Sequence, residues 1–216
     1  MKRSLLLSTA ALGMAVLPTA AAAQDWTGWY IGKHAGYLSG TVNFEEPSFF
    51  TDADLEGFIG GGLVGYGFAL NPGQPWVFGF EADFGIGNVS GDGDNFDDVD
   101  VDATLVVNHT DLEWNAHFRK YVGTAIGDNA MVFLAGGLAL ASIRVDSTYF
   151  ANPIEEVFVG ATIGGGVNFR LMPNLFGRVE GLYDYYPTRT IPHEGEGYEI
   201  GVSTWTARAA LVFELP

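Results

Sequence analysis

Apolar and polar side chains alternate over several stretches of the chain. Between positions 76 and 86 every second residue is apolar, and the residues between them include Glu81, Asp83 and two glycines. Successive side chains of a β-strand point to opposite faces, so this period of two predicts a strand with one apolar and one polar face. The same pattern predicts eight strands, at 29–37, 58–68, 76–86, 112–122, 134–140, 161–171, 178–185 and 204–213.

The links between these stretches alternate in length. Short links that form turns are expected at 70–75, 124–130 and 172–174, and long polar links at 41–56, 88–111, 144–156 and 187–199. Short turns at one end and long loops at the other are typical of an outer-membrane barrel. We therefore predict an all-β fold, an eight-stranded antiparallel up-and-down transmembrane β-barrel.

The polar faces of the predicted strands contain charges of both signs. In a soluble barrel of the lipocalin type polar faces meet water, whereas in a membrane barrel they face a narrow interior where acids and bases can pair. Side chains fill a barrel of eight strands, so we do not expect a wide diffusion pore. Two roles remain open for the interior, structural filling and the gating of a small conductance. The predicted barrel-interior ion-pair network consists of Glu81, Asp83, Glu113, Arg119, Arg178, Glu180 and Arg208.

The N-terminal residues predict export. Residues 1–3 form a short positive region, an apolar stretch follows at 5–17, and small residues occupy 18–23. A positive flank, a short apolar core and a small-residue cleavage site are the features of a secretory signal. We expect a signal peptide at 1–23 and an outer-membrane β-barrel domain at 24–216.

The charge balance and the absence of cysteine exclude several classes of protein. The 216 residues include 26 acidic and 10 basic side chains, which gives a formal net charge of −16. Nucleic-acid binders need lysine and arginine to neutralise phosphates, so this balance excludes them. With no cysteine in the chain, disulfide scaffolds and cysteine-ligated zinc are excluded as well.

Several motifs resemble those of small outer-membrane barrel proteins of alphaproteobacterial type. The opening WTGWYIG at 26–32 is followed by GFIGGG at 57–62, WVFGFEAD at 76–83, GGLA at 136–139 and RVE at 178–180. Their order along the chain is similar to that of the OmpA/OmpX-like superfamily, often described as "porin family" or "outer membrane protein beta-barrel domain". The resemblance implies the outer membrane of a Gram-negative bacterium, contact with its lipid and lipopolysaccharide, and insertion by the barrel-assembly machinery.

Three residues depart from the expected pattern. Leu215 stands where this family usually ends on an aromatic residue that the assembly machinery recognises. Lys33 and Lys120 fall on faces assigned to lipid, where a lysine costs about 2–4 kcal/mol at the bilayer midplane and about 0–1 kcal/mol near the interface. Either both lysines lie close to a rim of the barrel, or the local register is interrupted.

An acidic run between two predicted strands half-resembles a calcium loop. Phe96 and Asp97, however, occupy positions where such a loop requires a ligand and a glycine. The run is therefore expected to be a solvated acidic loop, with weak binding of a divalent cation, and through it of lipopolysaccharide, as the alternative. The weak candidate metal ligands are Asp92, Asp94, Asp97 and Asp98.

Residues suited to catalysis are few. A barrel enzyme needs a serine–histidine or aspartate–histidine set at its outer rim, and no spacing in this chain singles out such a set. We expect no catalytic residue, no cofactor and no resident metal. The residues near the predicted rim that carry the necessary groups are Ser90, His109, Asp111 and His193.

The pattern as a whole predicts a structural or surface protein that supports envelope integrity and presents acidic extracellular loops. Its surface or host ligands are not indicated by any motif. A narrow channel for small solutes or ions is the alternative within the same fold. A rim-catalytic lipid-modifying enzyme and a soluble lipocalin-like binder are further alternatives, and the missing G-x-W motif at the first strand disfavours the lipocalin.

Overall fold

The computed structural model describes residues 26–46, 52–70, 75–94, 107–127, 129–147, 151–193 and 196–216. The predicted signal peptide at 1–23 lies outside the described residues. Within the described ranges, no helix is long and apolar enough to cross a membrane. Eight strands follow one another along the chain: β1 (Gly28–Glu46), β2 (Ala53–Ala69), β3 (Trp76–Asp94), β4 (Val107–Ile126), β5 (Ala130–Ser147), β6 (Ile154–Met172), β7 (Leu175–His193) and β8 (Glu196–Glu214).

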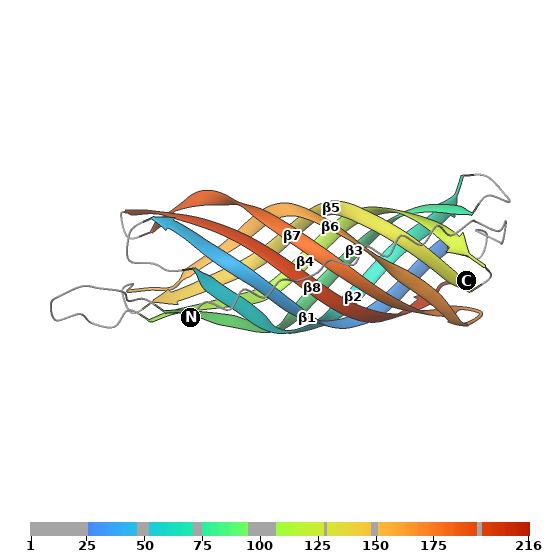
Figure 1. Ribbon diagram of the computed structural model, residues 1–216, viewed down its shortest axis with the longest axis horizontal. Helices are drawn as coiled ribbons and strands as arrows, with labels where there is room; N and C mark the ends of the chain where they lie inside the picture. Colours follow the sequence, from blue (N-terminus) through green and yellow to red (C-terminus); the bar gives the residue numbers. More distant parts are fainter. Residues whose placement is uncertain are drawn as a thin grey trace, which may run out of the picture.

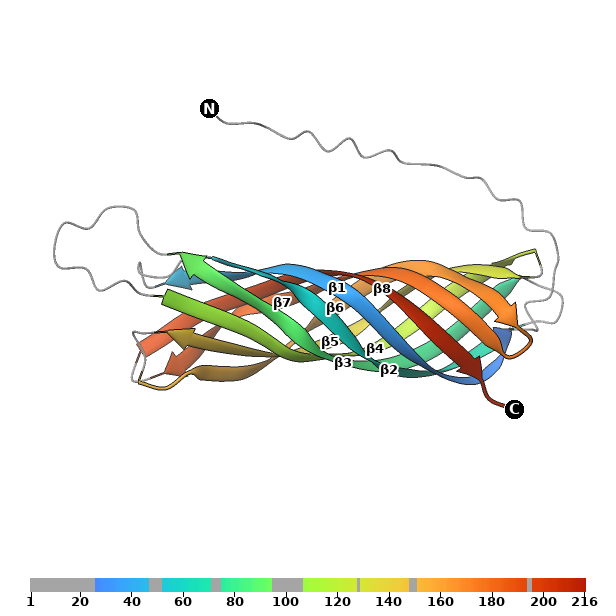
Figure 2. The same ribbon diagram turned by 90° about the horizontal axis from the view of Figure 1, so that it is seen from below.

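The eight strands form a closed barrel in which each strand pairs antiparallel with the next (Figures 1 and 2). The ring closes between β1 and β8, whose pairing runs from Tyr30 opposite Glu214 to Glu46 opposite Glu199. Closure leaves no strand edge, as a sheet in hydrocarbon requires. The predicted fold class is confirmed.

The strands are much longer than a membrane requires. They contain 17 to 20 residues, whereas a tilted strand crosses a bilayer in about 9–11. Much of what the sequence predicted as long polar links is therefore strand. The link expected at 187–199 is the clearest correction, because β7 and β8 stay paired up to His193 and Glu196. Polar residues can extend these strands because the backbone hydrogen bonds between β7 and β8 form in water as well as in lipid.

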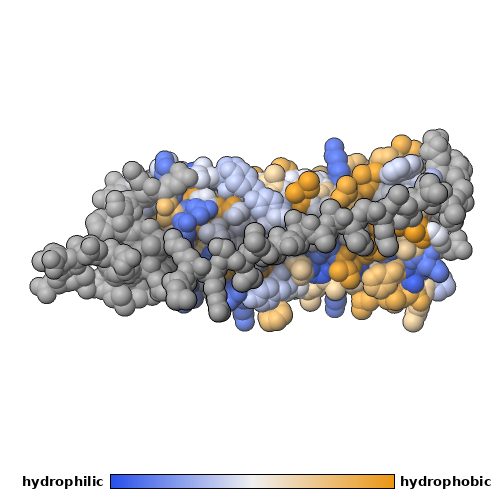
Figure 3. Space-filling model, viewed as in Figure 1, coloured by the Kyte–Doolittle hydropathy of each residue, from blue (hydrophilic) through white to orange (hydrophobic). Residues whose placement is uncertain are grey.

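In one half of the barrel the apolar faces point outward, as predicted. Exposed side chains there include Ile86, 58% exposed, Leu134, 68% exposed, and Trp205, 64% exposed. Figure 3 shows most of the strongly hydrophobic surface in the half of the barrel nearer to the end of β8. This half also contains the tight links at 127–129 and 173–174, and we call its end the short-turn end.

Toward the other end, which we call the projecting end, the pattern is inverted. Acidic side chains such as Asp54, Glu56 and Asp92 are exposed on the outer wall. Inside, all eight strands contribute to an apolar core that includes Leu38, Leu55, Phe158, Tyr186 and Ile200. The barrel therefore meets lipid along one half and water along the other.

A β-bulge in β4 changes which residues of this strand face inward. The pairing of β4 with β5 shifts between Leu112 and Trp114, so Glu113 is an extra residue in its strand. Leu112 is consequently 1% exposed, inside the barrel, although the alternation placed it on the lipid face with Trp114. The register break is local, and the rest of β4 keeps its predicted alternation.

Two adjacent glycines on β2 provide a test of the wall packing. A methyl group at Gly61 would overlap the backbone carbonyl oxygen of Phe84, whereas one at Gly60 would lie 3.4 Å from the carbonyl oxygen of His34. We expect Gly61→Ala to lower the free energy of unfolding by about 1–3 kcal/mol because β3 must move away. Gly60→Ala is the matched control and should have a clearly smaller effect. Urea unfolding of the barrel in lipid vesicles measures both, and equal effects would contradict this packing.

Candidate functional site

The lumen of the lipid-facing half holds a cluster of charged side chains. The structure brings together six of the seven residues predicted for the interior network, each at most 5% exposed. They come from strands that lie across the barrel from one another, β3 and β4 on one side and β7 and β8 on the other. We call this set the lumen cluster: Glu81, Asp83, Arg119, Arg178, Glu180 and Arg208.

Each guanidinium of the lumen cluster contacts carboxylates from other strands. Arg208 holds Asp83 through two hydrogen bonds of 2.9 and 3.0 Å, and its Nε donates to Glu180 at 2.7 Å. Arg119 donates to Glu180 at 3.0 Å and also contacts Glu81 and Asp83. Shared partners of this kind connect the pairs into one network across the lumen.

Arg178 closes the network on the side of the short-turn end. Its guanidinium contacts Glu81, and its Nε donates to Asn168 Oδ1 at 2.8 Å. The guanidinium carbon also lies 4.8 Å from the centre of the Phe133 ring. A buried cation is stabilised when its donors are used and an aromatic face covers it.

His117 and Asp184 also belong to the charged layer, although the predicted network did not include them. The His117 ring lies between two carboxylates, with Nδ1 2.7 Å from Asp83 and Nε2 3.2 Å from Asp184. Thr204 donates to Asp184 at 3.1 Å. With these two residues, three arginines face four carboxylates, and an imidazolium at His117 would balance the charge. The signal for both was present in the alternation, because both fall on inward positions.

Glu113 lies on the outer wall, so its predicted place in the network was wrong. The bulge in β4 places it on the same side as Trp114, and it is exposed. There it accepts a hydrogen bond of 2.9 Å from Ser142. A bulge breaks the strict period of two on which the prediction depended, and nothing in the residue types marks it.

Apolar layers cover the charged layer on both sides. Toward the projecting end lies the apolar core described above, to which all eight strands contribute. Toward the short-turn end lies a second layer, whose larger members are Trp26, Tyr30, Tyr121, Phe133 and Phe176. Tyr30 joins the two kinds of layer by donating a hydrogen bond of 2.9 Å to Glu81. The lumen is therefore a sequence of apolar, charged and apolar layers.

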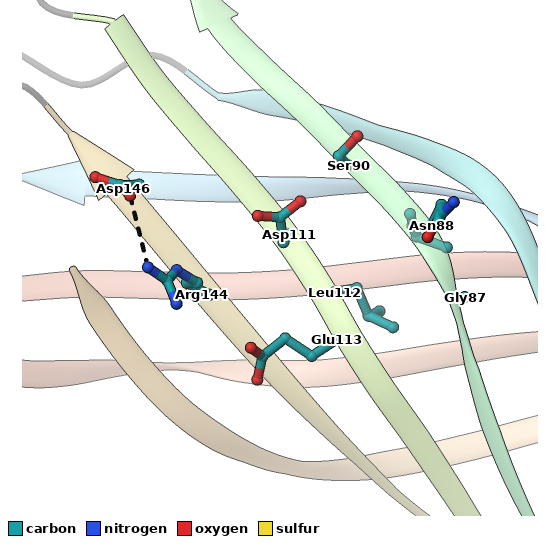
Figure 4. A pocket seen from close by; sticks show the side chains of 9 residues that line it. Gly87, Asn88, Ser90, Asp111, Leu112, Glu113, Arg144 and Asp146 are labelled. Carbon is teal, nitrogen blue, oxygen red and sulfur yellow. Dashed lines mark ion pairs between the residues drawn. The ribbon is translucent and has the colours of Figure 1, made fainter.

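A second polar site is a hollow on the outer wall of the projecting half. Its volume is about 700 Å³, and it spans β3, β4 and β5 beside the bulge. Figure 4 shows Asp111 and Glu113 on β4, between Ser90 on β3 and the Arg144–Asp146 pair on β5. Arg144 lies 3.7 Å from Asp146 and 2.8 Å from Glu155, so its charge is already neutralised within the wall.

Of the predicted rim residues, the structure shows His109 and Asp111 in contact with each other. His109 Nδ1 lies 2.7 Å from Asp92, and Nε2 lies 3.3 Å from Asp111. Both ring nitrogens therefore face carboxylates, and neither is placed to take a proton from Ser90. His193 contacts the backbone carbonyl of Asn152 at 3.0 Å.

Two of the four weak candidate metal ligands, Asp92 and Asp94, lie among the residues that the structure describes. Asp92 is engaged with His109, and Asp94 ends β3. Asp97 and Asp98 lie outside the described residues. Among the residues that the structure does describe, no group of three or more histidine and acidic side chains is arranged to hold a metal ion.

Comparison with known proteins agrees with this architecture. A family model described as "Outer membrane protein beta-barrel domain" matches residues 7–213. The chain belongs to this family. It is therefore an outer-membrane β-barrel protein of Gram-negative type, as the sequence motifs implied.

Relatives and solved structures support the same assignment. The chain is 27% identical over 218 residues to the 31 kDa outer-membrane immunogenic protein of Brucella melitensis, covering 91% of this chain and 88% of the relative. The protein of the same name from Brucella suis matches equally well. The crystal structure of the outer membrane protein OprG from Pseudomonas aeruginosa superposes with a TM-score of 0.55 at 10% identity, over 89% of this chain and 99% of OprG. At that identity the likeness shows the fold alone.

The lumen cluster predicts a large difference between buried and exposed arginines. Arg208→Leu leaves Asp83 and Glu180 without a main partner in a dry interior, and should lower the free energy of unfolding by about 3–5 kcal/mol. Arg144→Leu removes an exposed pair with Glu155 and should cost at most about 1 kcal/mol. Urea titration of both variants in vesicles measures these free energies of unfolding. Similar decreases in the two variants would show that the stability of the cluster does not depend on ion pairing.

The His109–Asp92 pair on the projecting wall predicts a pH dependence. The hydrogen bond that His109 Nδ1 donates to the Asp92 carboxylate raises the pKa of His109 above its ordinary value. A raised pKa in the folded state means that the pair stabilises the wall fully below the ordinary value of about 6.5, and that this stability is lost as pH rises through the folded pKa. NMR titration should show a lower His109 pKa in Asp92→Asn and no change in the control Asp54→Asn. An unchanged pKa in Asp92→Asn would contradict the pairing.

Proposed function

We propose that this protein is a sealed, non-enzymatic barrel that supports the integrity of the outer membrane and presents an acidic surface outside the cell. The observation that carries the proposal is the layered lumen, in which a charged layer with extensive pairing lies between two apolar layers. An ion that crossed it would have to displace buried ion pairs and then enter apolar packing without water. The function of such a protein therefore depends on its outer surfaces.

The projecting half supplies the external surface. Barrels of this kind place their short turns in the periplasm and their longer extensions outside the cell. The exposed outer wall of the projecting half is strongly acidic, and its arginines Arg144 and Arg189 pair with Glu155 and Glu156. A rigid acidic wall that continues the barrel into water is suited to contacts with the surroundings of the cell. Lipopolysaccharide of the outer leaflet, bridged to the acidic side chains by divalent cations, is a proposed partner.

The last strand supports a proposed contact with the barrel-assembly machinery. Leu211, Phe213 and Leu215 are all exposed on the outer wall, with Leu215 40% exposed. Leu215 thus continues the outward alternation of β8 in the place of an aromatic residue. The outward apolar alternation of this strand is what we propose the machinery recognises.

Planar-bilayer recording tests the sealed lumen. The wild-type protein should show no conductance steps above background, because two apolar layers block the path. Arg178→Gln should behave in the same way, since it weakens only the charged layer and leaves both apolar layers in place. Reproducible steps from the wild type would establish the alternative, a narrow channel. Steps that appear only in Arg178→Gln would show that the ion pairs are themselves a gate.

A further inference from the structure

Two lysines are the exceptions in the ion pairing of this protein. The six arginines that the structure describes all pair with carboxylates, three in the lumen cluster and three elsewhere: Arg144 with Glu155, Arg170 with Glu214 and Arg189 with Glu156. Lys33 and Lys120 are exposed on the outer wall, and neither forms an ion pair with a described residue. In a chain of net charge −16, two unpaired cations are a notable departure.

Both lysines lie within the lipid-facing half, at similar depths. Lys33 is four residues along β1 from Trp29, and Lys120 is opposite Phe80, four residues along β3 from Trp76. The two tryptophans are exposed near the short-turn end. Four residues of a strand tilted by about 45° rise by about 9 Å. The lysine stems can bring their ammonium groups back toward the interface on this side.

The register around both lysines is continuous. Lys33 is opposite Gly62 on β2 and Leu211 on β8, with unbroken pairing on either side. Lys120 is likewise within an unbroken stretch of the ladders to β3 and β5. Of the two explanations considered from the sequence, an interrupted register is therefore excluded. Both lysines point outward into the periplasmic half of the membrane.

An apolar groove lies beside Lys33 on the outer wall. Its volume is about 420 Å³, and it crosses β1, β8, β7 and β6 on the outer wall. Small residues Ala35 and Ala209 lie opposite each other in it, and Phe169, Leu171 and Val179 line it with larger side chains. A groove of this kind, next to a cation and continuous with the lipid-facing surface, is suited to a hydrocarbon chain with an anionic head.

We propose that Lys33 and this groove form a binding site for an anionic glycerophospholipid of the periplasmic leaflet. The Lys33 ammonium binds the lipid phosphate, and the groove beside Ala35 and Ala209 holds one acyl chain. Among the described residues no carboxylate pairs with Lys33, so we assign its counter-ion to the membrane. Lys120 has the same charge at the same depth but lies by Phe80, 6.0 Å from the ring centre, and serves as the matched control.

Native mass spectrometry of the full chain in mild detergent tests the site, with dioleoylphosphatidylglycerol and dioleoylphosphatidylcholine as probes. The wild type should bind phosphatidylglycerol about fivefold more tightly, the preference expected from one lysine near an anionic headgroup. Lys33→Gln should lose that preference, Lys33→Arg should keep it, and Lys120→Gln should change it less than twofold. Equal losses in Lys33→Gln and Lys120→Gln would overturn the site, because they would show general charge attraction.

A second pair of variants tests the groove separately from the charge. Ala209→Leu fills the groove and should weaken binding of both lipids, whereas Ala116→Leu, on the outer wall of β4, should not. If Ala209→Leu instead abolished a lipid-independent dimer in analytical ultracentrifugation, the groove would be an interface between two copies and the proposal would fail. Heat-modifiable migration on SDS gels confirms that each variant is folded. Lipid binding is measured independently of conductance. The outcome for the Lys33 site therefore does not decide whether the lumen is sealed.

Discussion

Closure of the hydrogen-bonded ladder is the constraint on which the rest of this structure depends. In hydrocarbon an unpaired backbone group has no water to bind, so the sheet must return to its own first strand. The pairing of β1 with β8 achieves this, and it fixes the number of strands and the narrow bore together. Because the bore is narrow, every inward side chain meets its neighbours across the lumen. The charged layer, the apolar layers and the outward apolar surface all follow from that geometry.

The lumen cluster shows why charges in a closed barrel come in complementary sets. Asp83 contacts Arg208, Arg119 and His117, so one carboxylate is shared by donors from two strands. Burial removes the water that would otherwise solvate these groups, and close pairing compensates for that loss. Two apolar layers keep the region dry, which strengthens each pair. The same arrangement that stabilises the wall supports the proposal of a sealed lumen, and with it the proposed role of the outer surface.

The outer surface differs along the barrel because its surroundings differ. In the lipid-facing half the exposed residues are apolar, and in the projecting half they are acidic. The interior of the lipid-facing half holds the charged layer and one apolar layer, whereas the interior of the projecting half is an apolar core. The bulge at Glu113 lies where these two patterns meet on β4. Lys33 and Lys120 form no ion pair with a described residue, and for Lys33 we propose a counter-ion from the membrane.

The sequence by itself determined the number of strands, their order and, apart from the bulge in β4, the face that meets lipid in one half of the barrel, because alternation is a local property. It also placed Arg208, Glu180 and their neighbours inside the barrel. What it could not determine is which inward residues meet across the lumen, since that depends on register and closure between strands far apart in the chain. His117 between Asp83 and Asp184 is one such case. Glu113 is another, because a bulge is decided by the pairing of two strands and not by the residues of one. The apolar layers of the lumen and the groove beside Lys33 likewise exist only once the cylinder is closed.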